Sequence, residues 1–178
     1  MTGWQGEVVD FWFGLKPEQW WKADPALDEL VRERFEPLWR EQRAFPAAHF
    51  LANARDALAA ILLFDQFPRN MYRGHAEQFA TDHLALVLAG EAVERDYDAA
   101  LSDTQRPFLY MPFEHSEKLG DQRRAVALFT ALGNADLLDF ARKHHDVVAR
   151  FGRFPHRNAM LGRAPRADEI AAGDVTPF

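Results

Sequence analysis

The chain has 178 residues, of which 48% are hydrophobic and 27% charged, a composition typical of globular proteins that argues against disorder. Its length favours a single domain over residues 1–178. Alanine and leucine together number 47, against 16 for valine, isoleucine and threonine, so the residues that favour strands are scarce. The absence of cysteine excludes disulfides, thiolate metal sites and cysteine nucleophiles. These numbers predict an all-α fold.

Two segments bear on the location of the protein. Residues 1–10 carry two acidic and no basic residues, which does not fit a secretory or organelle-targeting signal. The longest strongly apolar run, residues 57–64, is too short to cross a bilayer. We therefore expect a cytoplasmic protein with no membrane segment.

Apolar spacing and helix-breaking residues predict about six main helices. Pro37 is expected to kink or divide the second of them, and Pro68 to stop the third. Gly133 and Gly152 are expected to close two later helices, and residues 95–114 to hold short helical turns at most. Successive pairs with short links predict stacked antiparallel helical hairpins. The predicted helices span residues 2–13, 25–42, 53–65, 75–94, 116–132 and 135–151, with a short last helix at 165–172.

One sequence pattern occurs twice, at residues 64–70 and 151–158. Each copy reads Phe-x-x-Phe-Pro and then Arg-Asn, with one residue inserted in the second copy, and each follows a predicted helix. The phenylalanines can anchor the turn in the core, which leaves Arg and Asn as a tip rich in hydrogen-bond donors. Alternatively, these side chains only satisfy carbonyls at the helix ends. The candidate ligand-binding residues are Arg69, Asn70, Arg73, Arg153, His156, Arg157, Asn158 and Arg163.

The net charge of −6 is unevenly distributed along the chain. Residues 142–166 hold seven cations and only one anion, Asp146. Such a segment can form an anion-binding face, or its arginines can pair with surplus carboxylates elsewhere. Because the chain as a whole is acidic, nucleic acid is an unlikely partner.

Three ionisable residues occupy positions on the apolar faces of predicted helices. His144 lies in line with Ala141 and Val148, while Asp65 and Asp82 fall on the apolar faces of two other helices. Buried ionisable groups must be paired or must shift their pKa, so we expect a buried polar cluster supported by Asp65 and Asp82.

His115 and Glu117 lie at the start of the helix predicted for residues 116–132. Together with His144 they would suffice chemically for a transition-metal site or an acid–base pair, which makes these three the candidate catalytic residues. A core histidine hydrogen-bonded to a carboxylate explains His144 equally well. The spacing of His115, Glu117 and His144 is far less specific for a metal site than a His-Glu-x-x-His helix. No metal site is therefore assigned, and the cofactor is left open.

Several motifs in the same order resemble those of a bacterial family, domain of unknown function 924. The resemblance extends over about residues 8–170 and implies an all-helical fold similar to tetratricopeptide-repeat domains, with no activity to carry over. It departs from the family at residues 164–166, before the last helix. The motifs are Asp10-Phe-Trp-Phe-Gly14, Leu63 to Gly74, Phe79-Ala-Thr-Asp82, Pro112 to Glu117, Arg150 to Asn158 and Leu161-Gly-Arg163.

Three functions are compatible with these residues. The leading hypothesis is a binding module with a basic Arg/Asn/His pocket for an anionic small molecule or an acidic peptide. The alternative is an enzyme, possibly metal-dependent, that uses His115, Glu117 and His144. The third is a scaffold in which the polar residues only tie helix ends together. The oligomeric state is left open.

Overall fold

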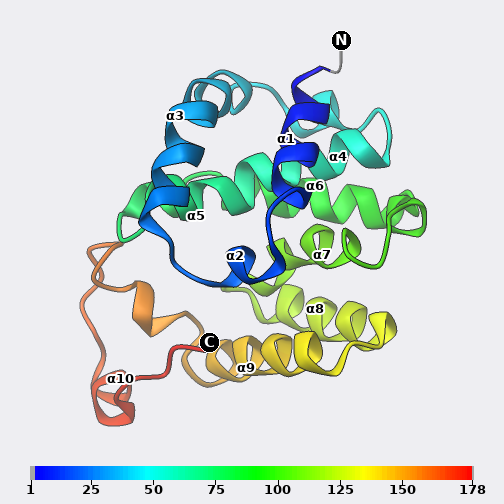
Figure 1. Ribbon diagram of the computed structural model, residues 1–178. Coiled ribbons are helices and arrows are strands. Elements are labelled where there is room, and N and C mark those ends of the chain that lie inside the picture. The colour runs from blue at the N-terminus through cyan, green and yellow to red at the C-terminus, as the bar shows by residue number, and fades with distance from the viewer. Residues whose placement is uncertain (1–2, 178) are drawn as a thin grey trace. The chain divides into compact units, whose positions relative to one another are not determined.

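The computed structural model describes residues 3–177 (Figure 1). Within this range the chain forms ten α-helices and five short 3-10 or π segments, and no strand. The all-α prediction is therefore confirmed, whereas about six main helices was too low a number. The chain divides into two compact units, unit 1 (Met1–Leu109) and unit 2 (Tyr110–Phe178). A single domain and a tetratricopeptide-like arrangement stay predictions.

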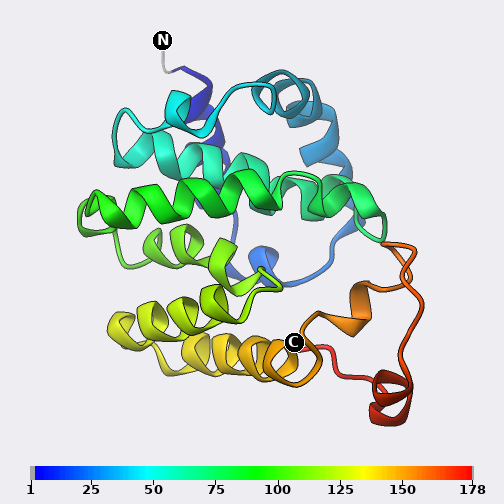
Figure 2. The same ribbon diagram turned by 180° about the vertical axis from the view of Figure 1, so that it is seen from behind.

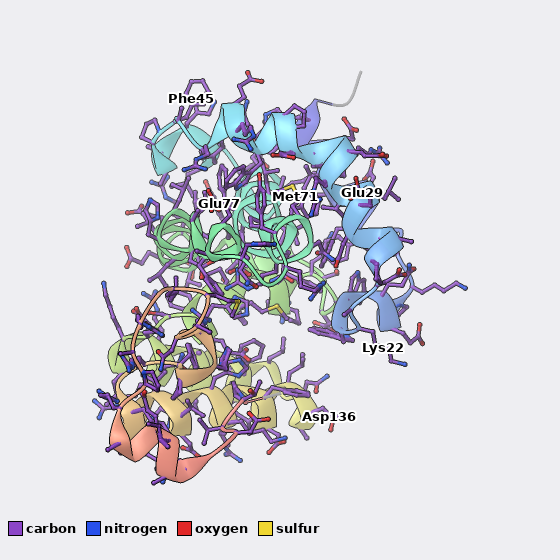
Figure 3. All side chains as sticks on the ribbon, turned by 90° about the vertical axis from the view of Figure 1, so that its left-hand side faces the viewer. Lys22, Glu29, Phe45, Met71, Glu77 and Asp136 are labelled. Carbon is purple, nitrogen blue, oxygen red and sulfur yellow. The ribbon has the colours of Figure 1, made fainter. Side chains whose placement is uncertain are left out.

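Unit 1 is built around α4, in which five successive residues from Ala57 to Ile61 are completely buried. The α4 helix packs against α1 and α6, and α3 packs against α5 (Figures 1 and 2). Lys22 and Glu29 lie on the exposed outer side of this unit (Figure 3). The helices of unit 1 are α1 (Trp4–Phe13), α2 (Pro17–Trp21), α3 (Pro25–Gln42), α4 (Ala54–Ile61), α5 (Phe67–Met71) and α6 (Asp82–Glu94), followed by α7 (Arg106–Glu114), which runs into unit 2.

The helix that begins with α4 does not stop before Pro68, contrary to the prediction. It widens into a π-helical turn at Leu62–Gln66 and continues as α5. Pro68 has no N–H for the carbonyl of Phe64, four residues earlier, and its ring would clash with that carbonyl in a regular α-helix. The π turn relieves the clash. The Thr81 hydroxyl donates a hydrogen bond to Phe64 O at 2.6 Å and so replaces the missing donor.

Of the two effects expected of Pro37, a division of the helix does not occur, because Pro37 and Glu33, whose carbonyl it leaves without a donor, are both exposed to water. Two other predicted boundaries were wrong. The helix expected at 75–94 consists of a 3-10 turn at Ala76–Phe79 and then α6, which begins directly after Thr81. The segment 95–114 contains α7, whose Pro107 lies in the first turn, where a helix needs no N–H donor.

Unit 2 contains a helical hairpin formed by α8 (Leu119–Leu132) and α9 (Ala135–Phe151), which pack side by side (Figures 1 and 2). Gly133 and Gly152 end these helices as predicted, with φ of 77° and 68°, values that favour glycine. The turn after α9 contains a 3-10 segment, Pro155–Arg157, and leads to α10 (Ala167–Ala172).

None of the helices described in residues 3–177 is long and apolar enough to cross a membrane.

Candidate functional site

The first copy of the repeated pattern lies in unit 1 and holds two carboxylates. Arg69 donates to both oxygens of Asp82, from Nη1 at 2.8 Å and from Nη2 at 3.0 Å. The same Nη1 donates to the carbonyl of Asp65 at 2.6 Å and lies 3.3 Å from the carboxylate of this completely buried residue. Asp65 and Asp82 therefore meet at one guanidinium, as the predicted polar cluster requires.

A third carboxylate of unit 1 belongs to Asp28 on α3. The Asn70 amide Nδ2 donates to its Oδ1 at 2.8 Å. Arg73 donates to both of its oxygens, from Nε at 2.7 Å and from Nη2 at 2.9 Å. The hydrogen bonds to Asp28 raise the pKa of Arg73. An asparagine amide and an arginine fork thus hold a single carboxylate.

The second copy of the pattern, in unit 2, holds Glu169 of α10 in the same way. Arg153 donates from Nε to Oε1 at 2.6 Å and from Nη2 to Oε2 at 2.8 Å. Asn158 Nδ2 donates to Oε2 at 3.0 Å, and the backbone N–H of Arg166 donates to the same oxygen at 2.7 Å. Chiefly through the hydrogen bonds from Arg153, the pKa of Glu169 falls to about 2. We call Arg153 and Asn158 the Glu169 clamp.

Glu117, just before α8, is bound by Arg163, which follows the second copy of the pattern. Arg163 donates to it from Nη1 at 2.7 Å and from Nη2 at 2.9 Å, and the backbone N–H of Phe154 donates at 2.8 Å. Burial acts to raise the pKa of Glu117, but the hydrogen bonds from Arg163 and Phe154 outweigh it and the pKa is lowered. At neutral pH this carboxylate is ionised, so it suits a structural tie better than a general acid.

The two turns resemble each other in how their asparagines are used, but their arginines are not equivalent. Asn70 and Asn158 each share a carboxylate with an arginine, which is Arg73 in unit 1 and Arg153 in unit 2. Arg157, the counterpart of Arg69 in the repeated pattern, is buried against the Phe154 ring. The phenylalanines anchor both turns as predicted, since Phe64, Phe67 and Phe154 are completely buried. Such pairing fits the alternative in which the arginines pair with carboxylates elsewhere in the chain.

His144 faces inward, as its position on the apolar face predicts. Its side chain is buried, and its Nδ1 lies 2.9 Å from Glu114 Oε1 and 2.9 Å from the carbonyl of Phe140. The His115 ring lies near it, with 6.4 Å between the ring centroids. In the part of the chain that the structure describes, no three His, Asp or Glu side chains are grouped to hold a metal ion. The arrangement is a buried histidine–carboxylate pair beside a second imidazole.

A hollow of about 360 Å³ lies in unit 2 between the turn after α9 and the segment around α10. Three of the predicted ligand-binding residues line it, His156, Asn158 and Arg163, together with Glu169 and Asp174. Burial, and then the charge of Arg157, lower the pKa of His156 to about 4. His156 is therefore neutral at pH 7. The apolar lining consists of Pro155, Ala159, Pro165, Ile170 and Val175.

The basic segment at 142–166 does not present its cations as one free positive face. Lys143 lies 2.8 Å from Asp139, and Arg166 lies 3.5 Å from Asp168. Arg157 is buried, with its guanidinium 4.4 Å from the centre of the Phe154 ring. The acidic excess of the chain is located in unit 1, which carries a net charge of −7, whereas unit 2 carries +1.

Sequence reasoning missed three carboxylates, Asp28, Glu114 and Glu169. Asp28 and Arg73 are 45 residues apart, and Arg153 and Glu169 are 16 apart, so no local spacing signals either pair. Glu114 lies within the Pro112–Glu117 motif, and its place directly before His115 was the available signal. All three are buried.

The amino-acid sequence matches a family of bacterial proteins of unknown function (DUF924) over residues 8–172. The chain belongs to this family. A solved structure of a protein of unknown function from Agrobacterium tumefaciens is 40% identical in sequence, with a TM-score of 0.87, and the match covers 94% of this chain and 95% of that one. Among curated proteins, none matches this DUF924 member at a significant level.

Proposed function

We propose that this DUF924 protein is a binding module, and that the hollow in unit 2 takes a small molecule with an apolar body and one anionic group. The observation that carries the proposal is the hollow itself. Its volume of about 360 Å³ falls in the range of small-ligand sites, and motif residues form part of its lining.

The walls of the hollow favour an apolar ligand body. Five of its lining residues are apolar, and one of these, Ile170, is 67% exposed. A ligand seated there would remove the Ile170 side chain from water, which is favourable by about 25 cal/mol for each Å² of apolar surface buried.

Part of the polar lining can receive one anionic group, while of the two lining carboxylates Glu169 is paired with Arg153 and Asp174 adds a negative charge. Neutral His156 can donate a hydrogen bond to a carboxylate, and the nearby charge of Arg157 that lowers its pKa also favours an anion. Four of the five N–H groups of Arg163 are already engaged by Asn158, Glu117 and the carbonyl of Phe154. At most one is left for a ligand, so we expect weak binding of a single carboxylate.

The test is an NMR titration of the ¹⁵N-labelled full-length chain with three probes. Hexanoate carries both an apolar body and a carboxylate, hexanol lacks the charge, and acetate lacks the body. We expect saturable shifts of amides in residues 155–175 with hexanoate, weaker shifts with hexanol and none with acetate.

Two matched variants locate the site. Ile170→Asp is expected to abolish the hexanoate shifts, because it places a negative charge in the apolar wall. Val87→Asp changes a similarly exposed apolar residue of unit 1 and is expected to leave them unchanged. Hexanoate shifts that do not saturate, or that persist in Ile170→Asp, would refute the proposal.

The alternative of an enzyme using His115, Glu117 and His144 receives less support from the geometry. Glu117 is engaged by Arg163 and Phe154, and His144 has Glu114 as its carboxylate neighbour instead. The buried pair of His144 and Glu114 is compatible with acid–base chemistry, but it fits a core histidine hydrogen-bonded to a carboxylate equally well.

A further inference from the structure

The short helix α10 is attached to unit 2 in an unusual way. Of its six residues, the one that is buried is Glu169, while its only branched apolar side chain, Ile170, is 67% exposed. A helix of this length has no appreciable stability of its own. The buried contact that α10 itself makes is therefore that of a carboxylate and not of an apolar side chain, while the segment before it is tied to the turn by Arg166 to the carbonyl of Phe151 and by Arg153 to the carbonyl of Ala164.

Arg166, directly before α10, also contacts this carboxylate, but the two other side chains that receive it belong to a turn that is anchored without α10. Arg153 and Asn158 flank Phe154, which is completely buried. Arg163 Nε donates to Asn158 Oδ1 at 3.0 Å, which turns Nδ2 of the same amide toward the carboxylate. Residues outside α10 therefore orient the Glu169 clamp, and the clamp can bind another carboxylate of the same geometry.

The matching contact in unit 1 has a different anchor. Asn70 and Arg73 hold Asp28, but Asp28 belongs to the 18-residue helix α3, whose apolar side chains are part of the core. Val31 and Phe35 on that helix are 0% and 1% exposed. Asp28 cannot leave its partners unless α3 leaves the core, whereas Glu169 lies on a helix that has no apolar side chain in the core.

We propose that the Glu169 clamp is a carboxylate-recognition site for acidic peptides, filled within the chain by Glu169, and that an acidic peptide segment can displace α10. The segment that fits has the chemistry of α10 itself, a glutamate next to an aspartate and a branched apolar residue, as in Asp168-Glu169-Ile170. This inference gives unit 2 a second ligand class and does not depend on the hollow binding hexanoate.

The first test measures peptide binding to the full-length chain by fluorescence anisotropy. The probe is a labelled synthetic peptide with the sequence of residues 165–177. We expect the Glu169→Gln protein, whose own carboxylate no longer fills the clamp, to bind it about tenfold more tightly than the wild type, as expected from the loss of charge-assisted hydrogen bonds. Adding Arg153→Met to Glu169→Gln should abolish binding, and so should Glu169→Gln within the peptide.

The second test measures amide hydrogen exchange and shows whether α10 has detached. In Glu169→Gln, amides of α10 are expected to exchange about tenfold faster, while those of α9 keep the wild-type rate, which also shows that the variant is folded. Asp168→Asn is the matched control, because Asp168 is exposed and its oxygen lies 3.5 Å from Arg166. We expect α10 to exchange at the wild-type rate in this variant.

Two results would overturn the proposal. One is unchanged exchange of α10 in Glu169→Gln, since the carboxylate would then not be what holds the helix. The other is a failure of the Glu169→Gln protein to bind the peptide, or equal binding of the peptide that lacks the glutamate. Neither result bears on the hexanoate titration, so the two proposals can fail separately.

Discussion

Thr81→Val tests how unit 1 accommodates a proline in the middle of a helix. The Thr81 hydroxyl donates to Phe64 O at 2.6 Å and accepts from Trp39 Nε1 at 3.0 Å. Thr81 is 2% exposed and Trp39 1%, so water cannot readily replace either bond. Valine has nearly the same shape and neither donates nor accepts, so the substitution leaves a carbonyl and an indole N–H without partners.

The expected cost follows from these two groups. Each buried polar group without a partner costs roughly 1–3 kcal/mol, so we expect Thr81→Val to lower the free energy of unfolding by about 3 kcal/mol. Urea denaturation followed by tryptophan fluorescence measures this change in unit 1, because all five tryptophans lie there. Thr104→Val, at an exposed position of the same unit, is expected to change it by less than about 0.5 kcal/mol.

A double-mutant cycle with Pro68→Ala isolates the part that concerns the π turn. Alanine at position 68 restores an N–H that can donate to Phe64 O, so the carbonyl no longer depends on Thr81. We expect Thr81→Val to cost about 1–2 kcal/mol less in the Pro68→Ala background. Additive effects of the two substitutions would refute the idea that Thr81 replaces the donor that Pro68 lacks.

Three further predictions concern unit 2 and its helix ends. His156 takes up its proton near pH 4 in the folded protein and near pH 6.5 in the unfolded chain, so the free energy of unfolding should fall as the pH drops from 6.5 to 4. The urea midpoint should fall less over this pH range in His156→Gln than in the wild type, and an NMR titration of His156 should give a pKa of about 4. Gly152→Ala should lower the free energy of unfolding by about 1 kcal/mol, because Gly152 has a positive φ. Gly90→Ala should raise it by about 0.5–1 kcal/mol, because Gly90 lies in the middle of α6 with open space where a Cβ would be added. Unfolding curves that show equal effects of the two substitutions would contradict this. Arg163→Ala should cost about 2–3 kcal/mol in the same assay by leaving Glu117 without its partner, and exposed Arg142→Ala should cost little.

The sequence was sufficient where a structural feature depends on neighbouring residues. Gly133 and Gly152 end α8 and α9 because a left-handed backbone favours glycine locally. His144 is buried because its position on a helix with a strong apolar face leaves it no other side. Both features depend on spacing within one helix, and both predictions are confirmed.

Helix boundaries were predicted wrongly where a residue distant in the sequence compensates for a proline. Pro68 normally ends a helix, but Thr81, 17 residues away from Phe64, supplies the donor that lets the chain continue. Residues 95–114 were expected to hold short helical turns at most, yet the apolar segment around Pro112 forms most of α7. A proline pattern alone does not show whether another part of the chain satisfies the freed carbonyl.

The repeated Phe-Pro turns show the same limit at the candidate site. Their sequence identifies Asn70 and Asn158 as donors, but the arginines that act with them, Arg73 and Arg153, are not the ones next to them in the pattern, and the carboxylates come from other helices. Whether such a contact is a structural tie or a ligand site depends on what anchors the helix that carries the carboxylate. Asp28 is fixed by the apolar core around α3, whereas Glu169 is itself the anchor of α10. Chemically matched turns can therefore have different roles, and the Glu169 clamp is the one whose carboxylate can be exchanged.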